Sequence, residues 1–123
     1  AEAVRAVRAI AEQHRHDVPC PLEVRFSAGD DALLAPSGGR ETCWIAVHQF
    51  ERIPWEPYFR EVDELLTHEY DGRPHWGKRH FRTAADLQPH YPGWGTFQAV
   101  RARLDPAGTF TNAHVERVLG AVA

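Results

Sequence analysis

The chain has 123 residues, of which 43% are hydrophobic and 25% charged, a length and composition typical of one soluble globular domain or one piece of a larger one. The net charge of −3 gives no general electrostatic attraction to nucleic acid, which we exclude as a partner. No apolar run approaches the ~20 residues of a membrane span and no leader segment is recognisable, so we expect a cytoplasmic protein, with membrane association as the open alternative.

The first half of the chain predicts one helix and two strands. Apolar residues recur with helical period over residues 1–15, whereas residues 22–27 alternate strictly between apolar and polar. Residues 42–48 are rich in β-forming residues and predict a second strand, antiparallel to the first. Because Cys20 and Cys43 lie in apolar surroundings, we expect two buried free thiols and leave a disulfide open.

The second half is predicted to be helical. An amphipathic helix over residues 58–70 is expected to stop at Gly72, and a Ser/Thr-x-x-acid pattern predicts a capped short helix over residues 83–87. A further helix is expected over residues 94–104, and Asn112 is placed to cap a last one. Two strands among amphipathic helices predict the α+β class, with antiparallel strands packed on the helices.

Between the first long helix of this half and the next lies an irregular segment, residues 72–78, with the sequence Gly-Arg-Pro-His-Trp-Gly-Lys. Its Gly-x-Pro start prevents a regular helix, because proline fixes φ and pushes the preceding residue toward extended geometry. His75 and Lys78 are therefore presented from irregular backbone, where functional side chains often lie. The alternative interpretation is a buried aromatic turn with a solvated lysine.

Three polar residues mark the predicted strands. Glu23 and Arg25 are two residues apart, so their side chains leave the same face of the first strand. Taken alone, this spacing favours an exposed ion pair that contributes ~0–1 kcal/mol. His48 ends the second strand, and it is either a pocket residue or a satisfied structural histidine.

Eight histidines raise the question of a metal site. The nearest groups are His14-x-His16 and the pair His75 and His80. Neither has the i, i+4 spacing of helical ligands or a Cys/His zinc pattern, and the two cysteines lie apart. We therefore expect no metal.

Five short motifs occur together along this chain. They are residues 23–26 (EVRF), 30–34 (DDALL), 72–78 (GRPHWGK), the pair Tyr91-Pro92, and residues 103–112 (RLDPAGTFTN). Together they resemble, in order, the C-terminal region of the FAD-dependent aldonolactone oxidoreductases, which belong to the vanillyl-alcohol-oxidase superfamily. The resemblance is to the D-arabinono-1,4-lactone oxidase type, is strongest to the gulonolactone oxidase/dehydrogenase group, and covers nearly the whole chain.

This resemblance implies that residues 1–123 form the C-terminal part of a substrate (cap) domain in a flavoenzyme. The FAD-binding domain would then lie outside this chain, which agrees with a start that lacks methionine and resembles a cut inside a longer protein. The implied activity is oxidation of a sugar-1,4-lactone, of the L-gulono or D-arabinono type, by hydride transfer to FAD.

The resemblance also implies which residues form the site. Glu23 would hydrogen-bond the substrate hydroxyls, and Arg25 would hold substrate oxygens and offset negative charge. Lys78 would be a second cation beside the reacting carbon and the flavin, with catalytic, substrate-binding and cofactor-binding roles. His48 would face the same pocket, and His75 would contact the flavin or support its own loop.

Two alternative functions stay open at this point. An alditol oxidase-type enzyme would oxidise a polyol with the same pocket chemistry. A non-catalytic, stand-alone domain would bind a ligand or partner without redox chemistry. Because the FAD-binding domain is the implied partner, we expect the isolated piece to be inactive, to expose an apolar face, and to be dimeric or poorly stable.

Overall fold

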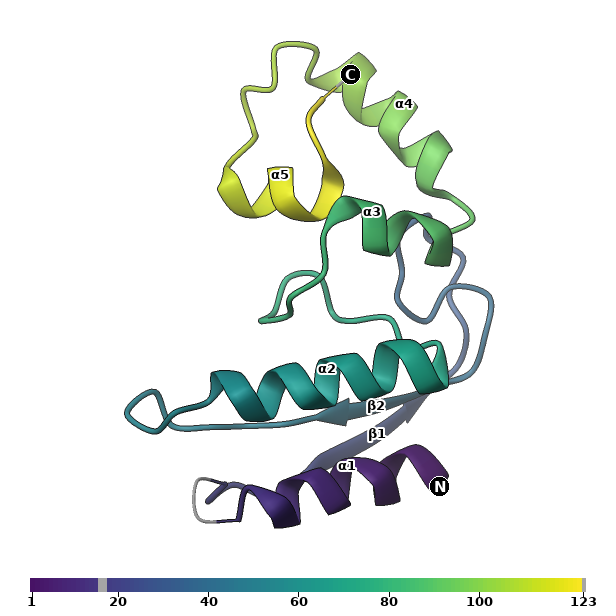
Figure 1. Ribbon diagram of the computed structural model, residues 1–123. Helices are drawn as coiled ribbons and strands as arrows, with labels where there is room; N and C mark the ends of the chain where they lie inside the picture. Colours follow the sequence, from purple (N-terminus) through teal and green to yellow (C-terminus); the bar gives the residue numbers. More distant parts are fainter. Residues whose placement is uncertain (16–17, 123) are drawn as a thin grey trace.

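The computed structural model describes residues 1–15 and 18–122 as a small sheet with helices around it (Figure 1). The predicted α+β class is confirmed, and the boundaries of the predicted elements shift by two residues at most. Within the described residues, no helix is both long and apolar enough to cross a bilayer. The elements in chain order are α1 (Glu2–Gln13), β1 (Glu23–Ser27), β2 (Thr42–Ala46), α2 (Glu56–Tyr70), α3 (Ala84–Leu87), the 3-10 turn η1 (Gln88–His90), α4 (Trp94–Leu104) and α5 (Ala113–Leu119).

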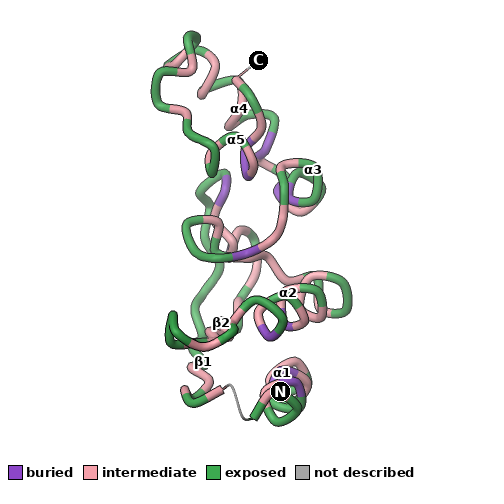
Figure 2. Tube along the Cα trace, turned by 60° about the vertical axis from the view of Figure 1, so that its left-hand side comes forward, coloured by how far each residue is buried: buried purple, intermediate pink, exposed green. Residues whose placement is uncertain are grey.

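Helices α1 and α2 pack together beside the two-stranded sheet, as Figure 2 shows. Their contact is formed by Val7 and Ile10 of α1 with Tyr58 and Val62 of α2, all of which are buried. Ile45 of β2 packs against this group from the sheet. Burying apolar surface stabilises the fold by about 25 cal/mol per Å² removed from water. This gain determines which face of the sheet turns toward the helices.

The strand register assigns the remaining side chains to the two faces. β1 and β2 pair antiparallel as predicted, with Val24 opposite Ile45. Because side chains alternate along a strand, these two share the inward face while Glu23 and Arg25 share the opposite one. Phe26 lies on the inward face by alternation, yet it is 80% exposed because it lies outside the cluster that the helices bury.

A second hydrophobic core lies at the other end of the molecule, among α3, α4 and α5 (Figure 1). It contains Leu87 of α3, Trp94 of α4, and Val118 and Leu119 of α5. Leu34, from the long connection between β1 and β2, is buried in the same cluster. The connection that separates the two strands therefore belongs to the second core, and the segment between α2 and α3 runs from one core to the other.

Helix α2 ends where predicted, although the left-handed residue is not the glycine. Asp71 takes the left-handed conformation with φ 49°, and Arg40 bonds both its carboxylate and its carbonyl oxygen at 2.7 Å. The N–H of Gly72 donates to the carbonyl of Leu66 at 2.7 Å, and a Cβ on Gly72 would lie 2.6 Å from that oxygen. Glycine is therefore required at this position for close backbone approach.

The two predicted helix caps are confirmed. Thr83 and Asp86 form the predicted capping box, with the backbone N–H and the hydroxyl of Thr83 each 2.8 Å from the Asp86 carboxylate. The Asn112 side chain accepts a hydrogen bond from the N–H of Val115 at 3.0 Å. These side chains satisfy backbone groups that the first turns of α3 and α5 leave unpaired.

The expectation of two buried thiols is wrong. Both cysteines are free, but Cys43 is exposed and Cys20 is only half-buried. Cys43 pairs with Phe26 at the end of the sheet that the helices leave uncovered, so its apolar surroundings in sequence do not become burial in space. His16 of the histidine pair considered above lies outside the described residues.

Candidate functional site

The predicted residues of the two strands form one contact group. The Arg25 guanidinium donates a hydrogen bond to Oε1 of Glu23, while Nε2 of His48 lies 3.5 Å from the other carboxylate oxygen, Oε2. The side chains of Glu23, Arg25 and His48 are 40%, 72% and 50% exposed. The carboxylate therefore lies between two basic groups at a surface that water, or a ligand, can reach.

The surrounding charges keep Glu23 ionised. The hydrogen bond from Arg25 lowers the pKa of Glu23, partial desolvation offsets some of this effect, and His48 lowers the pKa further. An ionised carboxylate only accepts hydrogen bonds, and the Arg25 guanidinium only donates them. The pair thus offers a ligand both kinds of polar partner on one strand face.

The segment between α2 and α3 presents the other two predicted residues in a tight turn. The carbonyl of His75 accepts from the N–H of Lys78 at 2.8 Å, and Nδ1 of His75 accepts from the N–H of Gly77 at 3.2 Å. Both His75 and Lys78 are exposed. A Cβ on Gly77 would lie 3.2 Å from the His75 ring, so the absence of a side chain there helps the turn to close.

Aromatic and cationic side chains hold this segment against α2. The Arg79 guanidinium lies 4.6 Å from the ring centroid of Trp55, which precedes α2, and the Arg60 guanidinium lies 3.9 Å from that of Phe81. Trp55 and Phe81 stack with centroids 6.4 Å apart. Each cation–π contact contributes about 0.5–1 kcal/mol at an exposed position.

The opposite side of the segment is held by buried polar groups. His80 is buried, and its Nδ1 accepts from the N–H of Arg82 at 3.2 Å. Desolvation first, and then the nearby charge of Arg117, lower the pKa of His80 to about 4, so its imidazole is neutral at pH 7. Arg82 in turn forms a 2.7 Å ion pair with Asp63 of α2, and both side chains are nearly buried.

Lys78 differs from the other cationic residues of the chain in its functional group. It is the one lysine among the 14 Lys and Arg residues of the sequence. Within the described residues, its ammonium group has no hydrogen-bond or ion-pair partner, although its neighbours on both sides are engaged. An exposed, unpartnered ammonium on a well-held turn is available to a ligand, and equally to water.

The structure therefore joins some of the predicted site residues and not others. Glu23, Arg25 and His48 are in direct contact, whereas His75 and Lys78 lie on a separate turn and form no hydrogen bond or ion pair with the first three. Of the segment's own supports, Arg79 was not singled out from sequence, and His80 was considered only as part of a possible metal pair. The dense alternation of aromatic and basic residues over 76–82 was the available signal.

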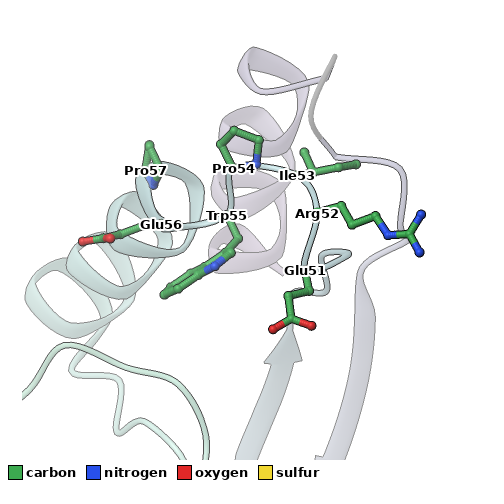
Figure 3. Close-up of a pocket in the computed structure, with 7 residues that line it drawn as sticks. All are labelled: Glu51, Arg52, Ile53, Pro54, Trp55, Glu56 and Pro57. Atoms are coloured by element: carbon green, nitrogen blue, oxygen red, sulfur yellow. The ribbon is translucent and has the colours of Figure 1, made fainter.

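Two surface cavities lie elsewhere. One, of about 280 Å³, is lined by residues 51–57, and Figure 3 shows the charged ends of Glu51, Arg52 and Glu56 pointing away from one another. The other, of about 310 Å³, is lined by Thr67, His68, Asp71, Arg82, Asp86 and His90. Neither cavity includes a predicted site residue, and the divergent charges of the first do not converge on a ligand.

The residues described here do not by themselves fit a complete flavin site. The five predicted residues line neither cavity, and they lie on exposed surface that cannot enclose a ring system. The paired glycines Gly38 and Gly39 lie in the connection between β1 and β2 and do not open a helix, as a phosphate cradle requires. Within residues 1–15 and 18–122, no three His, Cys, Asp or Glu side chains are placed to hold a metal ion.

Comparison with known proteins accounts for nearly the whole chain. Residues 1–118 match the model of the D-arabinono-1,4-lactone oxidase family. An L-gulono-1,4-lactone dehydrogenase of Mycobacterium tuberculosis is 50% identical over 119 residues, which are 97% of this chain and 28% of that protein. The L-gulonolactone oxidase of Mus musculus is 36% identical over 126 residues, covering 95% and 28% of the two chains.

A more distant relative acts on a different class of substrate by its name. The alditol oxidase of a Streptomyces species is 38% identical over 104 residues, which are 79% of this chain and 23% of that protein. The chain thus spans about a quarter of the length of these three curated relatives. By the match over residues 1–118, the chain belongs to the D-arabinono-1,4-lactone oxidase family.

Proposed function

We propose that residues 1–123 are the C-terminal part of the substrate domain of an FAD-linked oxidoreductase that oxidises a sugar-1,4-lactone of the L-gulono or D-arabinono type. The observation that carries this proposal is the Glu23–Arg25 pair with His48, grouped on the strand face turned away from the helices. Family membership and the 50% identical lactone dehydrogenase support the substrate class.

The strand residues would bind and orient the sugar. Ionised Glu23 accepts hydrogen bonds from substrate hydroxyls, which position the carbon to be oxidised. Arg25 donates to substrate oxygens and stabilises the negative charge that develops as a hydroxyl proton leaves. His48, on the other oxygen of Glu23, completes the substrate-binding face.

Lys78 would be the second cation of the site. Its single, compact ammonium carries three donors that rotate freely, unlike the planar guanidinium of the other 13 cations. We assign it to substrate and flavin contact and to catalysis through charge stabilisation. His75, exposed on the same turn, would contact the flavin edge.

The cofactor of the longer protein would be FAD, held mainly by a domain outside residues 1–123. The exposed site residues here fit one side of such a ligand and do not enclose it.

Exposed apolar side chains also point to a missing partner. Phe26, Leu104 and Phe110 are 80%, 71% and 83% exposed. We propose that these apolar side chains, which lie on different elements, are covered by the FAD-binding domain or, in the isolated piece, by a second copy, which sedimentation velocity would detect as a dimer.

The test is a hybrid enzyme. The matching 119-residue segment of the M. tuberculosis L-gulono-1,4-lactone dehydrogenase is replaced by that of this chain, and kcat/KM is measured with L-gulono-1,4-lactone. Glu23→Gln should lower kcat/KM by roughly 100-fold or more, since the charge of a positioned carboxylate is lost. Lys78→Arg should lower it by roughly tenfold, because the guanidinium does not reproduce a compact ammonium.

The matched control is the Arg8–Glu12 ion pair on α1, in which the arginine is about as exposed as Arg25 and the carboxylate is more exposed than that of Glu23. Glu12→Gln should leave kcat/KM unchanged. If Glu23→Gln behaves like Glu12→Gln in an active hybrid, the strand pair is only a surface ion pair and the proposal is wrong.

The alditol oxidase relative supports a second candidate, oxidation of an open-chain polyol through the same residues. A higher kcat/KM of the hybrid for xylitol than for the lactone would favour this candidate. A hybrid without activity on either substrate, in a folded and FAD-loaded protein, would favour a domain that binds ligands or partners without redox chemistry.

A further inference from the structure

The turn that carries Lys78 is bonded to α5 through two backbone carbonyls. Nε2 of His114 lies 2.8 Å from the carbonyl oxygen of Trp76, and the Arg117 guanidinium donates to the carbonyl of Arg82. Both donors come from α5, which lies 38 and 35 residues further along the chain than the carbonyls they bind. The last helix therefore contacts the segment on each side of residues 78–80.

The protonation of His114 follows from its two partners. The Arg117 guanidinium, which only donates, lies 3.4 Å from Nδ1 of His114, so Nδ1 must accept. The carbonyl of Trp76 only accepts, so Nε2 must carry the proton. Arg117 thus selects the tautomer in which His114 donates to Trp76, and a neutral imidazole satisfies both contacts at once.

The peptide plane between Trp76 and Gly77 is held on both sides, by His114 and by His75. The Trp76 carbonyl and the Gly77 N–H belong to the same planar unit, and in a trans peptide they point in opposite directions. The carbonyl is bonded to His114, and the N–H is bonded to Nδ1 of His75 at 3.2 Å. The ring of buried His80 also interacts with the backbone of Trp76. Because Gly77 has no Cβ, no side chain of its own opposes rotation of this plane, which would redirect the next residue, Lys78.

We propose that His114 is a positioning residue. With its tautomer selected by Arg117, it fixes the Trp76–Gly77 peptide plane and thereby the direction in which Lys78 is presented. His114 touches neither substrate nor cofactor in this proposal. Only the statement that Lys78 meets the substrate rests on the proposed function, whereas the positioning of the turn does not.

Two substitutions separate the two bonds of His114. His114→Gln can place an amide N–H where Nε2 donates to Trp76, and His114→Asn can place a carbonyl where Nδ1 accepts from Arg117 but cannot reach Trp76. Hydrogen exchange at the amides of Gly77 and Lys78 is measured on the ¹⁵N-labelled 123-residue chain. Because Lys78 is the one lysine, [¹³Cε]lysine labelling adds a single signal that reports on its side chain.

We expect His114→Asn to accelerate exchange at Gly77 and Lys78 about fivefold, as for one lost hydrogen bond, and to shift the lysine signal. His114→Gln should restore both values. The control His14→Asn, at the C-terminus of α1 and paired with Glu61, should change neither. The amide of Gly120, bonded to Glu116 at the end of α5, checks that the helix stays folded.

A result in which Gln and Asn behave alike, or in which neither changes the turn, would overturn the proposal. The parent chain gives an independent check: ¹⁵N shifts of the His114 ring must show the Nε2–H tautomer, and an Nδ1–H tautomer contradicts the proposal even if a variant fails to fold.

The hybrid enzyme separates this proposal from the proposed function. If the function holds as well, His114→Asn lowers kcat/KM roughly tenfold and His114→Gln restores it. If exchange responds as expected while Lys78→Met leaves kcat/KM unchanged, the positioning stands and the assigned role of Lys78 is wrong. If Lys78→Met lowers kcat/KM and exchange does not respond, the role of Lys78 stands and His114 is not a positioning residue.

Discussion

Burial of His80 makes the free energy of unfolding depend on pH. The residue is 7% exposed, and among the described residues its Nε2 makes no hydrogen bond of good geometry. Desolvation, with the charge of Arg117, lowers its pKa from 6.5 to about 4. The unfolded chain therefore binds a proton in a range where the folded chain does not, and stability must fall as the pH is lowered through that range.

The size of the effect follows from the two pKa values. The difference between 6.5 and about 4 corresponds to about 3 kcal/mol once the pH is well below both values. About 2 kcal/mol of this should be lost between pH 7 and pH 5. The carboxylates with lowered pKa values, including Asp71 and Asp86, lose their contribution at lower pH, so the histidine effect comes first on acidification.

The assay is urea unfolding at several pH values between 7 and 5, for the parent chain and for His80→Asn. Asparagine keeps an acceptor for the N–H of Arg82 but does not titrate, so the stability difference between the two proteins should change by about 2 kcal/mol across this range. His75→Asn is the matched control. Nδ1 of exposed His75 accepts from the N–H of Gly77, two positions later, just as Nδ1 of His80 accepts from the N–H of Arg82. Equal pH slopes for the parent chain and His80→Asn would refute the reasoning.

Two further substitutions test the packing around the candidate site. Arg82→Met leaves Asp63 nearly buried without its partner, so it should destabilise the chain by roughly 3 kcal/mol at pH 7. Burial already raises the pKa of Asp63, so the loss should diminish on acidification, and a pH-independent loss in urea unfolding would contradict this. Gly72→Ala places a Cβ 2.6 Å from a backbone oxygen and should lower the free energy of unfolding by about 2 kcal/mol. The control Gly95→Ala, in open space on α4, should raise it by up to about 1 kcal/mol. Equal thermal midpoints for the two alanine variants would refute the close-approach argument.

Local patterns were enough to predict the elements of this fold. The strict alternation of residues 22–27 correctly gives β1 and places Glu23 and Arg25 on one face. Helix ends were equally readable, because caps such as Asn112 and the Thr83 box depend on residues three positions away. Each of these predictions rests on interactions within one element or between neighbouring strands.

The failures have a common physical cause, which is contact between residues far apart in sequence. Phe26 alternates like a core residue, but it packs against neither hydrophobic core and is exposed. The bond between His114 and the Trp76 carbonyl joins positions 38 residues apart, and no periodicity marks it. The same limit applies to His75 and Lys78: their turn was predicted as irregular, but the contacts that hold it depend on α2 and α5.

Several of the arginines have a structural role. The guanidinium of Arg40 donates a hydrogen bond to the carboxylate of Asp71. Three other arginines donate to backbone carbonyl oxygens, namely Arg73 to Gly38, Arg101 to Gly120 and Arg117 to Arg82. A planar guanidinium with five donors suits such fixed, multiple contacts.

Lys78 carries a different functional group, and, as for Arg5, Arg52 and Arg103, its charged group has no hydrogen-bond or ion-pair partner within the described residues. If Lys78 were only a solvated surface charge, arginine would serve equally well at this position, as it does at those three. We propose instead that the ammonium of Lys78, on a turn held by its neighbours on both sides, meets a counterion that arrives with the ligand.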